Sequence, residues 1–256
     1  MPTRFHRNAR RLLGCLLALV APACIAAPLH DARQLIVVTT SGWDATSGQL
    51  QAFERTDEGW TAHDAGFAVA VGRSGSAWGI GLHPQQHTGP HKREGDGRSP
   101  AGIFSIGPAF GYADHISSQL PYQPMQASSY CMDVAASPLY NRIVDANQVG
   151  QAAVKGSTEA MRLDLHNNGD SRYREGFVIE HNPAAIPGQG SCIFAHLWRT
   201  PGEATAGCTA MEPQRMSALL AWLTPQARPL FVLLPAAEYQ RLQASWDLPT
   251  LPEAAR

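Results

Sequence analysis

Charged residues are scarce in this 256-residue chain, where they make up 16% of the sequence and leave a formal net charge of −1 at pH 7. No long run of like charge forms a basic or acidic tail. Proteins that bind nucleic acids through electrostatics carry a basic excess or a basic stripe, and this chain has neither. We therefore expect no nucleic-acid partner.

Glycine and proline are plentiful by contrast, with 23 and 19 residues. Together with the low charge, this composition favours a loop-rich fold with much β or irregular structure. The length suits one large domain or two small ones, with ample apolar material for a core. Neither an internal repeat nor a long linker is present, so we expect one domain over residues 33–235 and a C-terminal extension over 236–256.

The N-terminus has the three-part layout of a secretory signal peptide. A positive segment precedes the apolar run 12–20, and small residues follow it; the positive side chains are Arg4, Arg7, Arg10 and Arg11. The run is short for a permanent transmembrane helix. We expect a signal peptide over residues 1–26, export to the periplasm or another extracytoplasmic compartment, and no integral membrane segment after its removal. Lipidation at Cys24 is the alternative.

Five cysteines are present, and Cys15 and Cys24 fall within or beside the signal segment. Thiols in an oxidising compartment tend to pair, so the other three need an explanation. Our hypothesis is a disulfide between Cys131 and Cys192, which leaves Cys208 free for chemistry. Closing a loop of 61 residues contributes roughly 4 kcal/mol in the chain-entropy model. The alternative is that Cys131 and Cys192 are buried free thiols that pack as small hydrophobes.

Short β-branched or apolar runs bounded by turn residues predict several strands. They cover residues 34–40, 49–55, 60–64, 67–71, 103–106, 177–180, 192–196 and 230–234. One helix is well marked, because apolar residues from Met216 to Leu223 recur at helical spacing and Pro213 suits a first turn. A second short helix is expected over 238–246. Residues 83–100 are typical of a loop, and residues 112–168 show no clear period.

His196 and Cys208 belong to the segment richest in reactive side chains. A cysteine nucleophile needs a nearby base, and histidine is the usual partner because its pKa is near neutrality. Cys208 follows a Thr-Ala-Gly turn in which Gly207 permits a tight backbone, and we expect a helix directly after it. Backbone N–H groups of Gly207 and Thr209 would then stabilise an oxyanion, and the helix N-terminus would favour the thiolate. Taken alone, the same pair also fits a core histidine and a buried thiol.

Two segments carry a family resemblance. The first contains Ile-Phe-Ala-His-Leu-Trp at 193–198 and Thr-Ala-Gly-Cys at 205–208; the second is Lys-Arg-Glu-Gly-Asp-Gly-Arg-Ser-Pro-Ala-Gly-Ile-Phe at 92–104. Together with residues 140–145, they resemble the L,D-transpeptidase catalytic (YkuD-like) family, in its ErfK-like exported branch, over roughly residues 35–235. The chain departs from the family pattern at Ala206 and Ala210, where the family commonly has a histidine and an asparagine or arginine.

The resemblance implies a mainly β fold with a few helices (α+β), a single YkuD-like β-sandwich-type catalytic domain. It implies that Cys208 attacks the diaminopimelate–D-Ala bond of peptidoglycan stem peptides and that His196 takes the thiol proton. The resulting thioester passes to an amine, giving a 3→3 cross-link, and no cofactor is needed. Two alternatives stay open: an L,D-carboxypeptidase or endopeptidase with the same dyad, and a non-catalytic cell-wall-binding protein.

Further polar residues near these segments are candidates for substrate binding. They are Trp198, Arg199, Thr205, His181 and Asp96. Each of three has an alternative role: His181 a structural one, Arg199 an ion pair at the surface, and Asp96 the stabilisation of its loop. His83, His87 and His91 recur every four residues, but the intervening prolines and glycine argue against a helix that would gather them around a metal. We expect these three to be solvated loop histidines and predict no metal site.

Overall fold

A computed structural model of the chain describes Met1 and residues 28–252. The predicted signal peptide falls almost wholly outside the described residues, as do Cys15 and Cys24, so export stays a prediction. Among residues 28–252, no helix combines the length and apolar composition that crossing a membrane requires.

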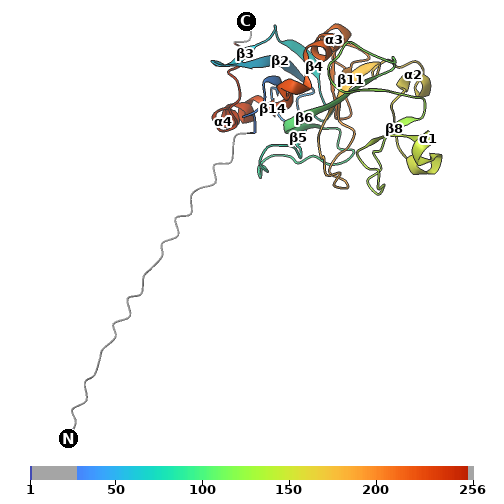
Figure 1. The fold of residues 1–256 in the computed structure, drawn as a ribbon, viewed down its shortest axis with the longest axis horizontal. Helices are drawn as coiled ribbons and strands as arrows, with labels where there is room; N and C mark the ends of the chain where they lie inside the picture. Colours follow the sequence, from blue (N-terminus) through green and yellow to red (C-terminus); the bar gives the residue numbers. More distant parts are fainter. Residues whose placement is uncertain (2–27, 253–256) are drawn as a thin grey trace.

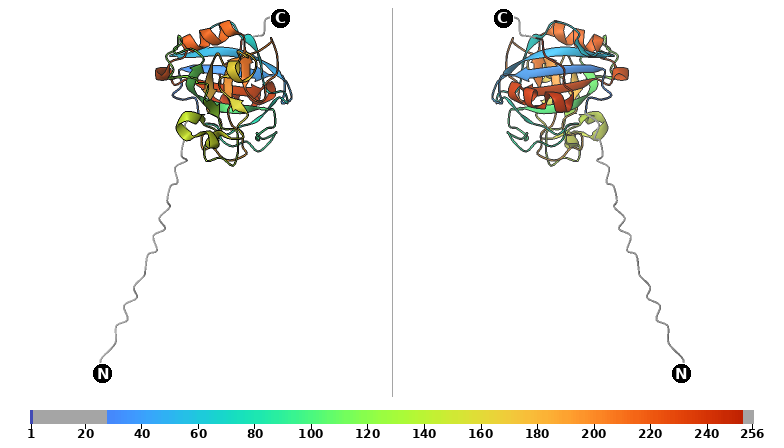
Figure 2. Two further views of the ribbon diagram at one scale, coloured as in Figure 1. Left: turned by 90° about the vertical axis from the view of Figure 1, so that its right-hand side faces the viewer. Right: turned by 90° about the vertical axis from the view of Figure 1, so that its left-hand side faces the viewer.

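Eight strands close into a mixed β-barrel. The closure depends on β1 (Gln34–Thr40), which pairs in parallel with β14 (Leu230–Pro235) on one side and antiparallel with β2 (Ser47–Thr56) on the other. From β14 the barrel continues through β6 (Ser99–Gly111), β11 (Glu175–Ile179), β12 (Phe194–Leu197), β13 (Thr209–Met211) and β4 (Phe67–Ala70), which returns to β2. Figure 2 shows β1 and β2, in blue, running across the body of the molecule.

The predicted β-sandwich is therefore wrong: the sheet closes on itself instead of forming two packed layers. Individual strands were visible in the sequence because each is a local apolar run. The closure of the barrel could not be predicted from the sequence. It depends on the pairing of Leu35 with Leu230, which lie at opposite ends of the domain, and on β2, which pairs with three strands. The alternation of side chains along a strand says which face is buried and nothing about which strand lies alongside.

Further strands extend the barrel wall. β3 (Gly59–Ala62) forms a hairpin with β2, while β5 (Ser76–Trp78) and β7 (Tyr122–Pro124) each pair with β6. The expected hairpin is thus present.

The stretch that showed no period forms a small second sheet in the order β10 (Glu159–Ala160), β8 (Ser129–Cys131), β9 (Ile143–Asp145). Short helices accompany it: α1 (Ala146–Val149), the 3-10 turn Gln151–Val154, and α2 (Leu163–His166). These pieces lie together at one end of the molecule, away from α4 (Figure 1).

Two longer helices pack on the barrel. α3 (Pro213–Trp222) buries Met216, Leu219 and Leu220, as the helical spacing predicted, and a short 3-10 turn (Pro225–Ala227) follows it. α4 (Ala236–Trp246) contacts β1 and β14 and buries the side chains of Tyr239, Leu242 and Trp246 in the main core. The segment after residue 235 therefore contributes to the core of the barrel domain.

Candidate active site

Strands β12 and β13 bring His196 and Cys208 to one face of the sheet. The strands are parallel, with His196 in register with Ala210 and Ala195 with Thr209. Ala195 and Leu197 point into the main core, so the alternation of the strand turns Phe194 and His196 the other way. Cys208 joins Phe194 in a second apolar cluster. Cys208 directly precedes β13, two residues before Ala210, the register partner of His196.

Both residues line one cavity of about 540 Å³ between the barrel and the small sheet. The loop containing Lys92, Glu94 and Gly95 lines the same cavity, so the two segments that carried the family resemblance meet there. The remaining wall comes from the small sheet and the chain after it: Asp133, Thr158, Glu159, Ala160, Leu163, His166, Asn167, Arg172 and Tyr173. Cavities that contain several convergent polar groups are the usual location of active sites.

Cys208 is buried, with 7% of its surface exposed. Its Sγ accepts a hydrogen bond from the Phe194 N–H at 3.3 Å, and the thiol lies 3.6 Å from the carbonyl oxygen of Cys192. Burial, followed by the nearby carboxylate of Glu159, raises the pKa of the Cys208 thiol to about 12. The expected help from a helix N-terminus is absent, because β13 follows Cys208 and α3 begins only at Pro213. The resting nucleophile is therefore a neutral thiol.

His196 is also buried and neutral. Burial lowers its pKa to about 4. Its Nδ1 lies 2.7 Å from the Leu197 carbonyl oxygen, and since a carbonyl only accepts, Nδ1 carries the proton. Nε2 is then the unprotonated nitrogen, able to take a proton. The ring packs against the edge of Tyr173, with centroids 5.1 Å apart.

Side-chain hydroxyls fix the turn that presents Cys208. Thr205 Oγ1 donates to the Cys208 carbonyl oxygen at 2.7 Å and accepts from the Gly207 N–H at 3.1 Å, while Ser99 Oγ donates to the same carbonyl at 3.0 Å. Gly207 is needed here, because its φ is 155° and an added Cβ would lie 3.0 Å from the Arg98 carbonyl oxygen.

The two backbone N–H groups that we expected to bind an oxyanion, those of Gly207 and Thr209, are not available for it. The Gly207 N–H is already used by Thr205, and Thr209 is a buried residue of β13 that does not line the cavity. Among the described residues, the N–H groups of Ala206 and Cys208 have no hydrogen-bond acceptor, and both residues line the cavity. These are the backbone groups of the turn that remain available to a substrate oxygen.

A disulfide joins Cys131 of the small sheet to Cys192 beside the nucleophile, with Cα atoms 5.9 Å apart. This is the pair that the sequence favoured. Cys208 is the one free cysteine in the described part of the chain. The disulfide ties the small sheet to the barrel wall at the edge of the cavity.

Three cavity residues that the sequence did not single out surround the dyad. Glu159 Oε1 accepts from the Tyr173 hydroxyl at 2.6 Å, and Arg172 is held against the buried Asp170, with Nη2 2.7 Å from Oδ2. Burial raises the pKa of Glu159 to about 7 and that of Tyr173 well above its ordinary value. These residues lie in or beside a stretch without periodicity, which offered no local signal for them.

The expected substrate-binding residues mostly lie elsewhere. Thr205 lines the cavity, but Asp96, Trp198, Arg199 and His181 do not. Asp96 is occupied by Lys92 Nζ and by backbone N–H groups of its own loop, and the exposed Arg199 pairs with Glu203.

His181 has the structural role that was the alternative to substrate binding. It is buried, with Nδ1 accepting from the Ile80 N–H at 3.2 Å and Nε2 2.9 Å from the Gln189 carbonyl oxygen.

One of the three loop histidines differs from the expectation. His83 is buried, accepts from the Ile103 N–H at 3.0 Å and packs against Trp78, Phe104 and Trp246. His87 and His91 are exposed. In the described part of the chain, no three side chains of metal-ligating type come together.

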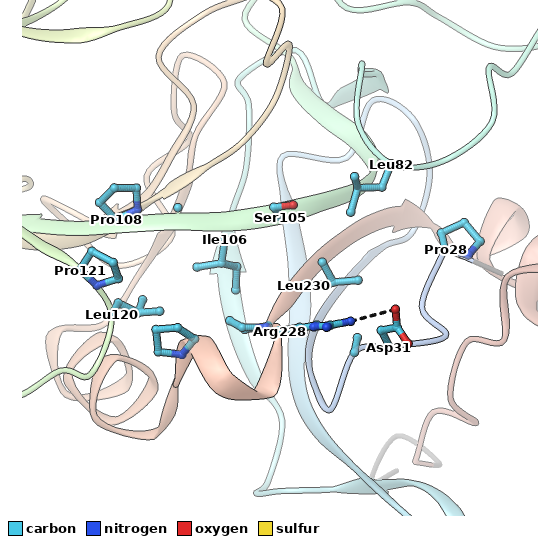
Figure 3. A pocket seen from close by; sticks show the side chains of 14 residues that line it. Pro28, Asp31, Leu82, Ser105, Ile106, Pro108, Leu120, Pro121, Arg228 and Leu230 are labelled. Carbon is cyan, nitrogen blue, oxygen red and sulfur yellow. Dashed lines mark ion pairs between the residues drawn. The ribbon is translucent and has the colours of Figure 1, made fainter. Parts of the chain in front are cut away.

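A second cavity, of about 500 Å³, lies elsewhere on the barrel. It is lined largely by apolar side chains and proline rings, among them Leu82, Ile106, Leu120 and Leu230, and an ion pair between Arg228 and Asp31 crosses one side (Figure 3). It contains no nucleophile next to a base. The cavity beside Cys208 is therefore the candidate active site.

Compared with known proteins, the chain matches no family model, no curated protein and no solved structure. The geometry around Cys208 and His196, and the two sequence segments that meet there, are the basis for assigning a function.

Proposed function

We propose that the protein is a cysteine acyltransferase of the L,D-transpeptidase type, acting on peptidoglycan stem peptides with Cys208 as nucleophile and His196 as base. The observation that carries the proposal is the presence of a free cysteine and an unprotonated histidine nitrogen on one face of adjacent strands, lining one cavity. The resemblance of residues 193–208 and 92–104 to the transpeptidase family supplies the substrate class. The β-sandwich that this resemblance also implied plays no part in the proposal.

In the first half-reaction, the thiol of Cys208 attacks the carbonyl between diaminopimelate and D-Ala. His196 Nε2 takes the thiol proton as the C–S bond forms and passes it to the departing D-Ala nitrogen, leaving a thioester. The Phe194 N–H supports the developing thiolate, and the Cys208 N–H is available to the oxyanion. Because thiol and imidazole are both neutral at rest, substrate binding has to bring the proton transfer and the attack together.

In the second half-reaction, an acceptor attacks the thioester and restores the thiol. An amine from a second stem gives a 3→3 cross-link, whereas water gives hydrolysis of the donor. A wall-binding protein that lacks turnover is the remaining alternative, favoured by Ala206 and Ala210 at positions where the family has polar side chains. The free thiol and the histidine that line one cavity favour turnover.

The test is release of D-Ala from a diaminopimelate-containing tetrapeptide by the protein from residue 28 onward. We expect release by the parent protein and loss of at least about 1,000-fold in Cys208→Ala and in His196→Gln, since nucleophile and base act as a unit. Arg199→Gln, at an exposed residue that does not line the cavity, is the matched control and should retain the parent rate. A folded parent protein that binds the peptide without releasing D-Ala would favour the wall-binding alternative.

A further inference from the structure

Glu159 is the carboxylate of the cavity most closely linked to the dyad. It belongs to β10, where it is in register with Cys131, and Cys131 is bonded to Cys192 beside the nucleophile. Its Oε1 accepts from the hydroxyl of Tyr173, whose ring edge packs on His196. The disulfide and the tyrosine thus hold this carboxylate in a fixed position relative to Cys208 and His196.

The two oxygens of Glu159 differ in their surroundings. Oε1 accepts its hydrogen bond from Tyr173, whereas Oε2 receives none from any described residue. Because Glu159 lines the cavity, Oε2 is the oxygen that remains open to a donor from a bound molecule. Asp133 and Glu94 line the same cavity and repel the charge on Glu159, whereas Arg172 favours it. Arg73 and Lys92 also line the cavity; Lys92 is paired with Asp96 and Arg172 with Asp170. The three carboxylates would attract a cationic donor that reaches Oε2.

Negative charge at Glu159 works against the first half-reaction, since it is one of the causes that raise the pKa of Cys208. If Glu159 contributes to the reaction, it therefore does so in a step other than the formation of the thioester. The second half-reaction offers such a step, because an amine acceptor arrives as an ammonium ion and must lose a proton before it can attack. A base whose pKa lies near neutrality is best suited to remove that proton.

Taking the proposed function as its basis, we infer that Glu159 binds the acceptor ammonium group and takes its proton, so that the acyl acceptor is an amine of a second stem peptide. The ammonium proton moves to Oε2 of Glu159 and later to solvent. The freed amine attacks the thioester carbonyl, forming the C–N bond, and the C–S bond breaks. The second nitrogen proton passes through His196 to the departing thiolate of Cys208, which restores the thiol. Tyr173 is a positioning residue that orients the carboxylate.

The test separates the two half-reactions by using two peptides. The donor is a tetrapeptide whose diaminopimelate side-chain amine is acetylated, so that it cannot act as acceptor; the acceptor is a tripeptide with that amine free. D-Ala release in the first turnover, measured as a burst of up to one equivalent per protein molecule, reports the first half-reaction. The mass of the cross-linked product reports the second. Glu159→Gln keeps the shape of the side chain and removes its basicity.

For Glu159→Gln we expect D-Ala release at the parent rate or faster, with transfer to the amine reduced about 100-fold or more, in the range of general-base contributions. The thioester then accumulates or hydrolyses to the tripeptide. Tyr173→Phe keeps the ring against His196 and should lower transfer less than Glu159→Gln does. Glu58→Gln removes an exposed carboxylate in the turn between β2 and β3, outside the cavity lining, and is the matched control, with transfer unchanged.

Parallel loss of D-Ala release and transfer in Glu159→Gln would overturn the inference, because it would show a merely structural role. Unchanged transfer would overturn it as well. Absence of D-Ala release by the parent protein is a different result: it would contradict the proposed function, and the inference with it.

Discussion

Removal of the Cys131–Cys192 disulfide should destabilise the domain strongly. The bond closes a loop of 61 residues, and the chain-entropy model gives a contribution of about 4 kcal/mol for a loop of this length. The loop runs from the small sheet, whose strands are two or three residues long, through β11 of the barrel to Cys192. In the unfolded chain the disulfide restrains all of this segment, so its removal frees that entropy.

The perturbation is the double variant Cys131→Ala/Cys192→Ala in a Cys208→Ala background, where no thiol remains in the described chain to form a wrong pair. Urea unfolding at pH 7, followed by fluorescence, gives the free energy of unfolding of the variant and of the Cys208→Ala parent. We expect a difference of about 4 kcal/mol, which for a domain of this size corresponds to a melting temperature lower by roughly 8–16 °C. A difference below about 1 kcal/mol would refute the loop-entropy reasoning.

Three further predictions concern pH, thiol reactivity and the turn. The pKa of His181 and of His196 is about 4 in the folded chain, below the ordinary 6.5. The unfolded chain therefore binds these protons first, and urea unfolding should show stability present above pH 6.5 and falling toward pH 4, by about 3 kcal/mol per histidine; a flat profile would contradict their burial. Alkylation of Cys208 by iodoacetamide should keep rising with pH up to at least pH 9, because its pKa is about 12; the curve should move to lower pH in Glu159→Gln, and a plateau near pH 7 would contradict the neutral thiol. Gly207→Ala should lower the free energy of unfolding by about 1–3 kcal/mol, because its Cβ would meet the Arg98 carbonyl oxygen in a backbone conformation that favours glycine; a change below about 0.5 kcal/mol would show that the turn relaxes.

Local patterns predicted local structure well. The apolar run at 34–40 became β1, the spacing from Met216 to Leu223 became α3, and the two-residue turn before Gly59 closed a hairpin. Each of these depends on neighbours in sequence. Barrel closure depends instead on β1 meeting β14, and the fold class was wrong for that reason.

The residues of the candidate site likewise fall into those that one sequence segment predicted and those that only the tertiary structure brings together. His196, Cys208, Thr205 and Gly207 lie within one short segment, and the structure places all four on one cavity. The strand after Cys208 took the place of the expected helix, so burial rather than a helix dipole governs the thiol. Glu159 reaches the cavity through the pairing of β10 with β8, and Tyr173 through the segment before β11; no local pattern revealed either placement.

The central claim is that Cys208 is an acylating nucleophile activated by His196. Intact-mass spectrometry after incubation with a carbapenem tests it most directly, because enzymes of the resembling family are acylated by these compounds on the catalytic cysteine. We predict one covalent adduct on the parent protein, none on Cys208→Ala, and slow formation on His196→Gln. A folded, reduced parent protein that stays unmodified, or an adduct that persists in Cys208→Ala, would contradict the account.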